Sequence, residues 1–142
     1  MATNHTLAIV KPDAVSRGLA GKILAHLESE GFRLVAARVV RLSDREAAAF
    51  YEVHRERPFY RSLVDFMISG PCMPLALDRD DAVATLRRVI GATDPKEAAA
   101  GTVRKLYAES KERNAIHASD SDDNAARERQ FFFAGGELIQ AK

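Results

Sequence analysis

Hydrophobic residues recur along the chain with the spacings that strands and helices require. The continuous apolar run at residues 6–10 is typical of a buried strand. Alternating residues rich in valine predict a second strand over residues 32–42, and residues 72–77 predict a third. Pro74 cannot donate to a sheet ladder, so it indicates a sheet edge or a bulge in the third strand. A short fourth strand is expected near residues 115–117.

Helical spacing and helix-start signals predict helices at residues 19–30, 44–54, 59–68, 82–90 and 123–131. The residues Ser43-Asp-Arg-Glu46 form a capping box, and Ser121 or Asp122 can cap the last helix. Asp80 or Asp81 can cap the helix at 82–90. The periodicity fades over residues 92–116, which we interpret as a long ordered loop, because long loops inside compact domains are usually functional. Two glycines, Gly135-Gly136, predict a break before an apolar tail.

The order of these elements indicates an α+β fold. Strand, helix, strand, two helices, strand, helix and strand is the order of a ferredoxin-like split βαβ sandwich. Its sheet has four antiparallel strands, and residues 44–68 form a helical-hairpin insertion. A chain of 142 residues can bury one real core but not two ordinary ones, so we expect a single domain over residues 1–142.

Composition and charge exclude several classes of protein. There are 21 Lys and Arg residues against 20 Asp and Glu residues, and the basic residues are scattered, so no nucleic-acid or membrane surface is indicated. The single cysteine, Cys72, allows no intrachain disulfide and is interpreted as a small core residue. The sequence contains neither a secretory signal pattern nor a membrane-length apolar run. We therefore expect a cytoplasmic protein.

Candidate chemistry gathers at Asn114-Ala-Ile-His117-Ala-Ser119-Asp120. A neutral imidazole fixed by nearby polar groups is a competent nucleophile for a phosphoryl or acyl group. The alternative is a polar loop that enters a helix. Three isolated cations are expected at a strand end, a helix end and the long loop: Lys11, Arg87 and Arg104. Together with Mg²⁺ they could neutralise a polyphosphate, although each alone reads as a surface charge.

Familiar phosphate and metal motifs are missing from the sequence. Gly18-Leu-Ala-Gly21-Lys22 resembles a phosphate loop, but its glycines are too close together and no Ser or Thr follows the lysine. The acidic stretch Asp120-Ser-Asp122-Asp123 lacks the glycine and the final glutamate of a calcium loop. Phosphate chemistry here would therefore depend on isolated cations and a histidine.

A series of ordered motifs covers nearly the whole chain: Leu7-Ala-Ile-Val-Lys11-Pro12-Asp13-Ala14, Phe50-Tyr51-x-x-His54-x-x-x-Pro58-Phe59, Ser69-Gly70-Pro71, Gly91-Ala-Thr93-Asp94-Pro95, Gly101-Thr102-Val-Arg104 and Asn114-x-x-His117-Ala-Ser119-Asp120. In this order and spacing they resemble the nucleoside diphosphate kinase family. The resemblance implies that His117 takes the γ-phosphoryl group of a nucleoside triphosphate and gives it to a nucleoside diphosphate. Ping-pong kinetics would follow from such a covalent intermediate.

The resemblance also implies roles for other residues. Glu128 and Ser119 match the pair that supports the nucleophile, and Tyr51 matches the residue beside its imidazole. The expected nucleotide contacts are Lys11, Phe59, Arg87, Thr93, Arg104 and Asn114. Phe59 would stack on the base, and its alternative reading is core packing beside Pro58. No protein metal site is expected, because the family's Mg²⁺ is held mainly by the nucleotide phosphates.

The resemblance further implies the partners: ATP and other nucleoside triphosphates and diphosphates, deoxy forms included. It implies a homo-oligomer built from dimers, either a tetramer or a hexamer, with no membrane and no obligatory nucleic acid. Two other classes of protein remain open. A binding regulator on the same fold predicts exposed aromatics on the strands, which read as aliphatic. A phosphorelay component would need neither Phe59 nor the three cations.

The sequence departs from the family pattern at several positions. Ala118 replaces the glycine that commonly follows the nucleophile, which is compatible with the motif only where the backbone needs no positive φ. Ala100 replaces a proline, Arg79 replaces a glycine in a turn, and 105–107 replaces a more usual Ala-Asp-aromatic run. None of these changes removes the nucleophile or a phosphate contact, so they bear on assembly and stability.

Overall fold

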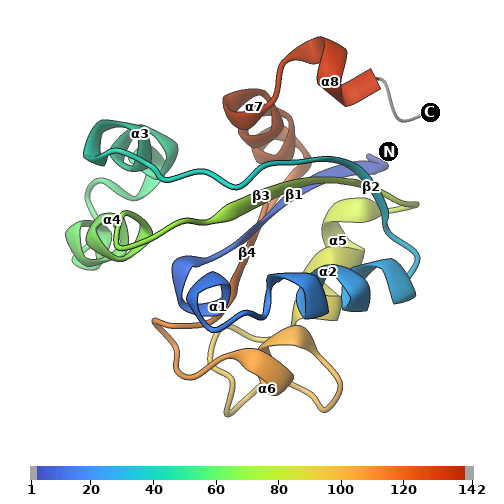
Figure 1. Cartoon of the computed structure of the whole chain (residues 1–142), viewed down its shortest axis with the longest axis horizontal. Helices are drawn as coiled ribbons and strands as arrows, with labels where there is room; N and C mark the ends of the chain where they lie inside the picture. Colours follow the sequence, from blue (N-terminus) through green and yellow to red (C-terminus); the bar gives the residue numbers. More distant parts are fainter. Residues whose placement is uncertain (1–2, 140–142) are drawn as a thin grey trace.

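A four-stranded antiparallel sheet forms the centre of the molecule (Figure 1). The computed structural model describes residues 3–139. The strands lie in the order β2-β3-β1-β4, each antiparallel to its neighbours. Their bounds are β1 (His5–Val10), β2 (Arg33–Ala37), β3 (Met73–Asp78) and β4 (Ile116–Ala118). The sheet and the helices around it confirm the predicted α+β architecture.

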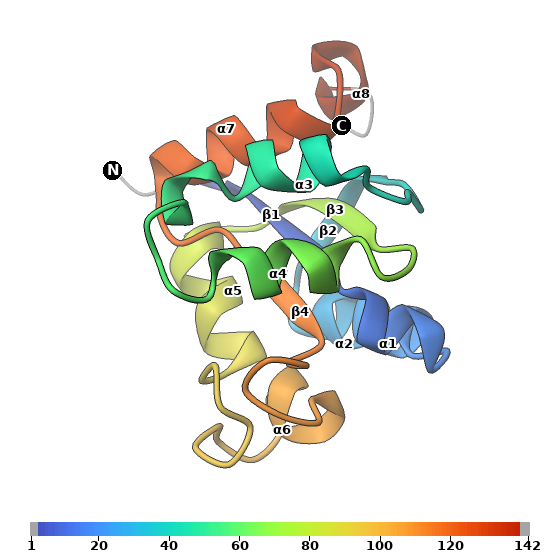
Figure 2. The same cartoon turned by 90° about the vertical axis from the view of Figure 1, so that its left-hand side faces the viewer.

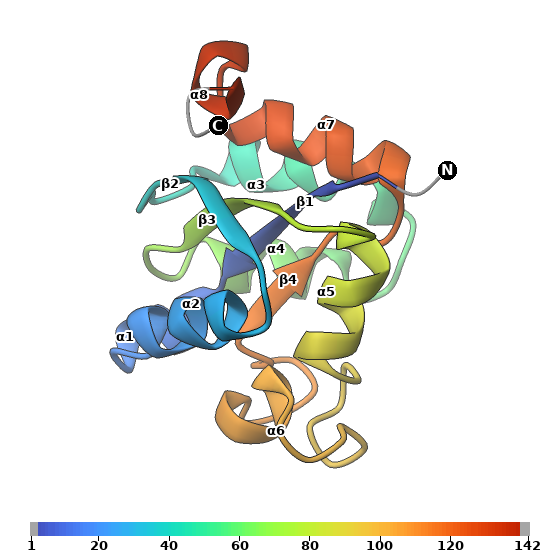
Figure 3. The same cartoon turned by 90° about the vertical axis from the view of Figure 1, so that its right-hand side faces the viewer.

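Helices cover both faces of this sheet (Figures 1 and 2). One face packs against α1 (Pro12–Ser16), α2 (Ala20–Ser29) and α5 (Ala82–Ile90), and α6 (Val103–Tyr107) joins the same core cluster beside α5. The other face packs against α3 (Asp44–Phe50), α4 (Tyr60–Met67), α7 (Asp122–Phe132) and α8 (Gly135–Ile139), with a 3-10 turn, η1 (Glu52–His54), between α3 and α4. Figure 3 gives the view from the side of α2 and α5. Among residues 3–139, no helix combines the length and the apolar character needed to cross a membrane.

Strand β1 is buried on both of its faces. Ala8 and Val10 belong to the core beneath α2 and α5, whereas Leu7 and Ile9 belong to the core beneath α3 and α7. All four side chains are fully buried. A strand covered on both sides must be apolar at every position, which explains why its sequence is a continuous run rather than an alternation. The strand therefore ends, at Val10, with its neighbours Ile9 and Lys11 still buried.

The second predicted strand was too long. β2 ends at Ala37, and of the predicted residues beyond it only Val40 makes a bridge, to Cys72. The pairing with β3 also shifts register between Leu34 and Ala36, which interrupts the regular alternation. Valine alternation alone therefore overestimated the length of the ladder.

The interpretation of Pro74 was also wrong. β3 lies inside the sheet between β2 and β1, and the register shift falls opposite Leu77 and Ala76 rather than at Pro74. The regular pairing between β2 and β3 ends at Leu75, which lies next to Pro74 in the sequence and opposite Ala37. A proline has no N–H with which to continue the ladder, so it is accommodated where β2 ends.

Short helices account for the other differences from the predictions. α1 was not predicted, and it begins with Pro12 at its first position. α6 interrupts the stretch over residues 92–116 that we interpreted as loop. α8 begins at Gly135, where a break was expected. Each has five residues, too few to show a 3.6-residue period. The end of the predicted apolar tail, residues 140–142, lies outside the described residues.

The predicted helix caps are partly confirmed. The Ser43 hydroxyl accepts from the Glu46 N–H at 3.1 Å, and the Glu46 carboxylate accepts from the Ser43 N–H at 2.9 Å. Ser121 caps α7 by accepting from the Asn124 N–H at 3.1 Å. Asp81 occupies the N-cap position of α5, but its side chain makes no capping bond and its φ is 50°.

Removing the capping box at α3 is expected to destabilise the protein. In Ser43→Ala the free energy of unfolding in urea should fall by about 1 kcal/mol, because the Glu46 N–H loses its acceptor. Ser62→Ala is the matched control, since Ser62 is exposed inside α4 and its change should stay within about 0.5 kcal/mol. Equal losses in the two variants would contradict the capping role.

Candidate functional site

His117 lies in the middle of the edge strand β4. It pairs with Ile9 of β1, and its neighbours Ile116 and Ala118 point into the core beneath α5. Because side chains alternate along a strand, the imidazole points to the opposite face, toward α3 and α7. The side chain of His117 is 18% exposed, so one part of the ring is accessible.

Glu128 of α7 orients the imidazole. Its Oε1 atom lies 2.8 Å from Nε2 of His117 and accepts a hydrogen bond from the Ser119 hydroxyl at 2.7 Å. The carboxylate can only accept, so Nε2 carries the proton and Nδ1 keeps its lone pair. Glu128 and Ser119 are both buried, which protects this arrangement from competition with water. The predicted support pair is therefore brought together with the imidazole.

Aromatic rings pack around the imidazole edge. The ring of Phe50 lies 5.4 Å from that of His117 and the ring of Tyr51 lies 5.9 Å from it, both edge to face. The Tyr51 hydroxyl is buried without a hydrogen-bond partner. Burial, followed by the charge of Glu128, raises the pKa of this phenol, so Tyr51 stays neutral. The row of rings continues through His54 to Phe59, a residue that is 49% exposed.

Lys11 is a buried cation at the end of β1. Its Nζ atom donates to Oδ1 of Asn114 at 2.9 Å. Burial lowers the pKa of Lys11 to about 8, with a further lowering by Arg104 and an opposing rise from Asp13. Predicted residues Lys11 and Asn114 are thus in direct contact, beside a second positive charge.

Arg104 of α6 is the second buried cation. Its guanidinium donates to the carbonyls of Gly91, at 3.1 Å, and Ile116, at 2.7 Å, while its Nε has no partner. Burial lowers the pKa of Arg104 to about 10, and the charge of Arg87 adds to this effect. Burial is thus the main cause of both lowered pKa values, and repulsion between neighbouring cations adds to it.

An open hollow of about 430 Å³ lies between α5 and α6. Three predicted phosphate contacts line it: Arg87, Thr93 and Arg104. The lining also includes Arg88 and Glu97, but not Lys11, His117 or Phe59. Three of the expected phosphate contacts therefore gather in one region, whereas Lys11 and Phe59 lie outside this hollow.

Asp120 connects the hollow electrostatically to the imidazole. Its carboxylate accepts from the Asn124 amide at 2.7 Å, and this bond is the main cause of its lowered pKa. The charges of Arg87 and His117 lower the pKa further. Arg87 and His117 therefore both lie within electrostatic reach of one carboxylate.

Gly91 lines the hollow and allows a close approach between α5 and α6. Its φ is 89°, and a Cβ placed there would lie 2.6 Å from the hydroxyl oxygen of Thr102. Only glycine allows both this conformation and this approach. The end of α5 and the start of α6 are consequently held against each other.

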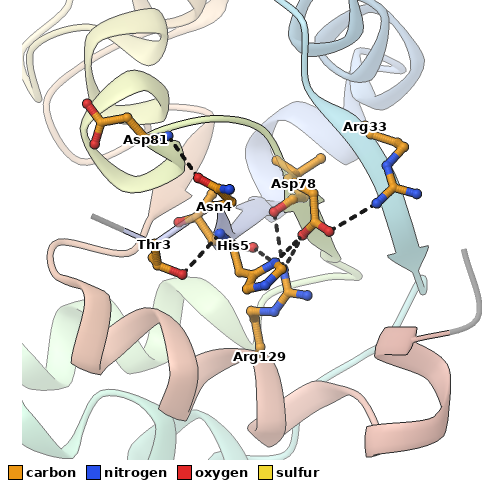
Figure 4. A network of polar contacts seen from close by, with 9 residues as sticks. Thr3, Asn4, His5, Arg33, Asp78, Asp81 and Arg129 are labelled. Atoms are coloured by element: carbon orange, nitrogen blue, oxygen red, sulfur yellow. Dashed lines mark hydrogen bonds and ion pairs between the residues drawn. The ribbon is translucent and has the colours of Figure 1, made fainter. Parts of the chain in front are cut away.

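Sequence reasoning missed the residue that anchors α7. Arg129 is buried, and its Nη1 atom contacts the carbonyls of Thr6 and Leu77 and the carboxylate of Asp78 at 3.0 to 3.3 Å (Figure 4). Asp78 also holds His5 at 2.8 Å and Arg33 at 3.2 Å. Helical spacing could have indicated that Arg129 is buried, because it lies on the same face of α7 as the other buried residues, Ala125, Glu128 and Phe132.

The departures at Ala118 and Arg79 have structural explanations. Ala118 lies in β4 with an extended backbone, so no glycine is required there. The Arg79 guanidinium donates to the carbonyl of Glu30 and lies 5.7 Å above the ring of Phe32. Arg79 therefore ties the end of β3 to the turn before β2.

No group of three or more His, Cys, Asp or Glu side chains among residues 3–139 is arranged to hold a metal ion. The charged side chains that line the hollow are three arginines, Arg87, Arg88 and Arg104, and one glutamate, Glu97. Such a site suits an anion, or a metal ion that arrives bound to one.

Comparisons with known proteins agree with this geometry. The family model described as nucleoside diphosphate kinase matches residues 4–138. A nucleoside diphosphate kinase of Chlorobium chlorochromatii is 56% identical over 137 residues, which cover 96% of this chain and 98% of that protein. One of Acidiphilium cryptum is 52% identical over 139 residues, covering 98% of this chain and 99% of that protein.

Solved structures match the fold equally well. The nucleoside diphosphate kinase of Aquifex aeolicus superposes with a TM-score of 0.94 at 45% identity, covering 97% of this chain and 100% of that chain. A halophilic nucleoside diphosphate kinase from Halobacterium salinarum, solved in complex with CDP, superposes with a TM-score of 0.92 at 37% identity, covering 99% of this chain and 93% of that chain. The similarity extends over nearly the whole chain.

The arrangement around Glu128 makes a prediction about the tautomer of His117. Long-range ¹H–¹⁵N spectra at neutral pH should show a protonated Nε2 and an unprotonated Nδ1, because the carboxylate accepts from Nε2. In Glu128→Ala the two tautomers should both be populated. His26 is the internal control, since Glu128 does not contact it and its spectrum should stay the same. A single Nε2–H tautomer in both proteins would contradict the orienting role.

Proposed function

The chain belongs to the nucleoside diphosphate kinase family and has its activity, and we propose that His117 carries the phosphoryl group between nucleotides. Nδ1 attacks the γ-phosphorus of a nucleoside triphosphate, the bond to the bridging oxygen breaks, and the diphosphate leaves. A second diphosphate then attacks the phosphohistidine through its terminal oxygen, which restores the imidazole. One site thereby serves donor and acceptor in turn.

The observation that carries this proposal is the 2.8 Å contact between Nε2 and Glu128. As Nδ1 forms its bond to phosphorus, positive charge develops on the ring. The fixed carboxylate stabilises that charge without having to reorganise. Ser119 holds the carboxylate in place through its hydroxyl. Tyr51 packs against the ring and restricts its rotation.

Lys11, Arg87 and Arg104 are proposed to bind the phosphates. Their mutual repulsion in the free protein is relieved when a polyphosphate lies between them, which favours binding of the most highly charged ligands. Asn114 positions Lys11, and Thr93 in the hollow adds a hydroxyl. Phe59, being half exposed, offers a face on which any base can stack.

We propose that Mg²⁺ enters the site bound to the nucleotide. Because the cations around the hollow cannot bind a metal ion, the phosphate oxygens would hold most of its coordination. Asp120 is a carboxylate within electrostatic reach of the same region. When bound, Mg²⁺ supplies further neutralisation of the transferring phosphoryl group. The protein's own part is to position His117 and the phosphate-binding cations.

The substrates and assembly are proposals as well. The Halobacterium salinarum relative was solved with CDP, and we propose that this chain likewise accepts diphosphates and triphosphates of several bases, deoxy forms included. We further propose that it works in the cytoplasm as a homo-oligomer of dimers, as a tetramer or a hexamer.

Labelling with γ-³²P ATP and Mg²⁺ tests the role of His117. After removal of nucleotide, the wild-type protein should retain acid-labile label on the peptide containing His117, and unlabelled GDP should remove it as labelled GTP. His117→Ala should retain none, whereas His26→Ala, a substitution in α2, should behave like wild type. If folded His117→Ala retained label from ATP and passed it to GDP, the proposal would be overturned.

The lowered pKa of Lys11 predicts how nucleotide binding depends on pH. Phosphates bind the protonated amine, so affinity is full below the pKa of about 8 and decreases as pH rises through it. The Kd for ADP, measured by calorimetry, should therefore rise by roughly tenfold between pH 7 and pH 9. Arg104, with a pKa of about 10, stays charged over this range.

Lys11→Met should bind ADP weakly at pH 7 and lose most of this pH dependence. Lys22→Met is the matched control, because Lys22 is an exposed lysine of α2. A wild-type Kd that is constant between pH 7 and pH 9 would refute the role assigned to Lys11.

A further inference from the structure

A strained turn stands directly before the nucleophile. Ala115 has a φ of 74°, and the Ile116 N–H donates to the carbonyl of Asn114 at 2.9 Å. A positive φ with a bond between residues i and i+2 is the geometry of a γ-turn of the rare, strained kind. An alanine in this region brings its Cβ against the backbone, so the surroundings must hold the conformation.

Both backbone groups of Ala115 are held by one short segment. Its N–H donates to Oδ2 of Asp13 at 3.1 Å, and its carbonyl accepts from the Lys11 N–H at 2.9 Å. Ala115 is fully buried and Asp13 is 2% exposed. The junction between β1 and α1 therefore clamps the turn from two directions.

The clamped turn also connects the parts of the proposed site. Asn114, at its start, accepts from the Lys11 amine, and Ile116, at its end, accepts from the Arg104 guanidinium at 2.7 Å. His117 follows immediately. A change in the turn would thus move the nucleophile relative to both buried cations.

Asp13 is a buried carboxylate that the proposed mechanism does not use. One of its oxygens, Oδ1, has no hydrogen-bond partner, which is costly in a buried position. Its charge also raises the pKa of Lys11 against the effect of burial. A merely structural explanation exists, since Asp13 lies in the first turn of α1, where a negative charge favours a helix.

We propose that Asp13 is a positioning residue, which holds Ala115 in its left-handed turn and thereby aligns His117 with Lys11 and Arg104. The inference rests on the proposed function, because the aligned reaction is phosphoryl transfer to His117. The structural explanation and the positioning role differ in one respect. Only the positioning role depends on the strain at Ala115.

The first test is Asp13→Ala in the full chain. Without its anchor the alanine relaxes out of the left-handed region, so the rate of His117 phosphorylation by γ-labelled ATP in a single turnover should fall roughly tenfold. Measured at about pH 6, where Lys11 stays protonated even without the charge of Asp13, the KM for ATP should change by less than about threefold, because Arg87 and Thr93 lie outside the turn. An unchanged rate would overturn the proposal.

The second test adds Ala115→Gly to Asp13→Ala. Glycine adopts a positive φ without steric cost, so the rate should recover to within about threefold of wild type. Ala115→Gly alone should keep the wild-type rate to the same margin. Loss of the α1 first-turn charge cannot be repaired at position 115. Absence of recovery would therefore favour the structural explanation over the positioning role.

A readout independent of catalysis separates this inference from the proposed function. Hydrogen exchange of the Ala115 amide should be slow in wild type and faster in Asp13→Ala, whether or not His117 accepts label. Asp123→Ala removes an exposed first-turn carboxylate from α7 and serves as the control, with unchanged exchange at Ala115 and an unchanged rate. A wild-type protein that takes no label would refute the proposed function alone.

Asp13→Asn covers the case in which Asp13→Ala does not fold. Its neutral oxygen is a weaker acceptor, so the phosphorylation rate should fall about threefold and the Ala115 amide should exchange faster, and Ala115→Gly should restore the rate. A folded Asp13→Asn with wild-type rate and exchange would overturn the proposal.

Discussion

The burial of positive charge is the constraint on which this structure depends. Lys11 and Arg104 are buried beside each other, Arg87 adds a third charge, and burial and mutual repulsion lower the pKa values of the two buried groups. Without the surrounding fold, these charged side chains would move apart and into water. The fold keeps them together through backbone carbonyls and one amide, which accept hydrogen bonds from them and carry no negative charge. Asp13 offsets the charge of Lys11 only in part, and an anionic ligand supplies the rest of the counter-charge.

Holding these charges in place requires a rigid backbone. The site is accordingly built at the end of β1, a strand whose residues 7–10 are fully buried. β1 delivers Lys11, β4 delivers His117, and the two strands are paired directly. α7 contributes Glu128 from the opposite face, anchored to the sheet by Arg129. The catalytic geometry is therefore set by the sheet and one helix, while the segment between α5 and β4 supplies the exposed Thr93 and the buried Arg104.

Local pattern predicted the elements that are long or fully buried, because burial on both faces makes a strand apolar throughout, as at β1. Periodicity could not reveal helices as short as α1 and α6. It also could not reveal that β2 ends where its partner strand β3 reaches Pro74, which has no N–H to donate to the ladder. His117 was indicated by the polar residues around it. Asp13 and Arg129 look like solvated charges in the sequence, and their burial depends on partners far away along the chain.

The two adjacent side chains Glu128 and Arg129 reach from α7 to different strands, one to β4 and the other to the ends of β1 and β3. Neighbouring residues on a helix differ by 100° in direction, so both contacts can form at only one rotation and one axial position of α7. The connection over residues 119–121, between β4 and α7, consequently acts as a spacer of fixed length despite its polar sequence. Variation in chain length is tolerated more readily before Asn114, in the exposed stretch over residues 109–113, than in these few residues after the histidine.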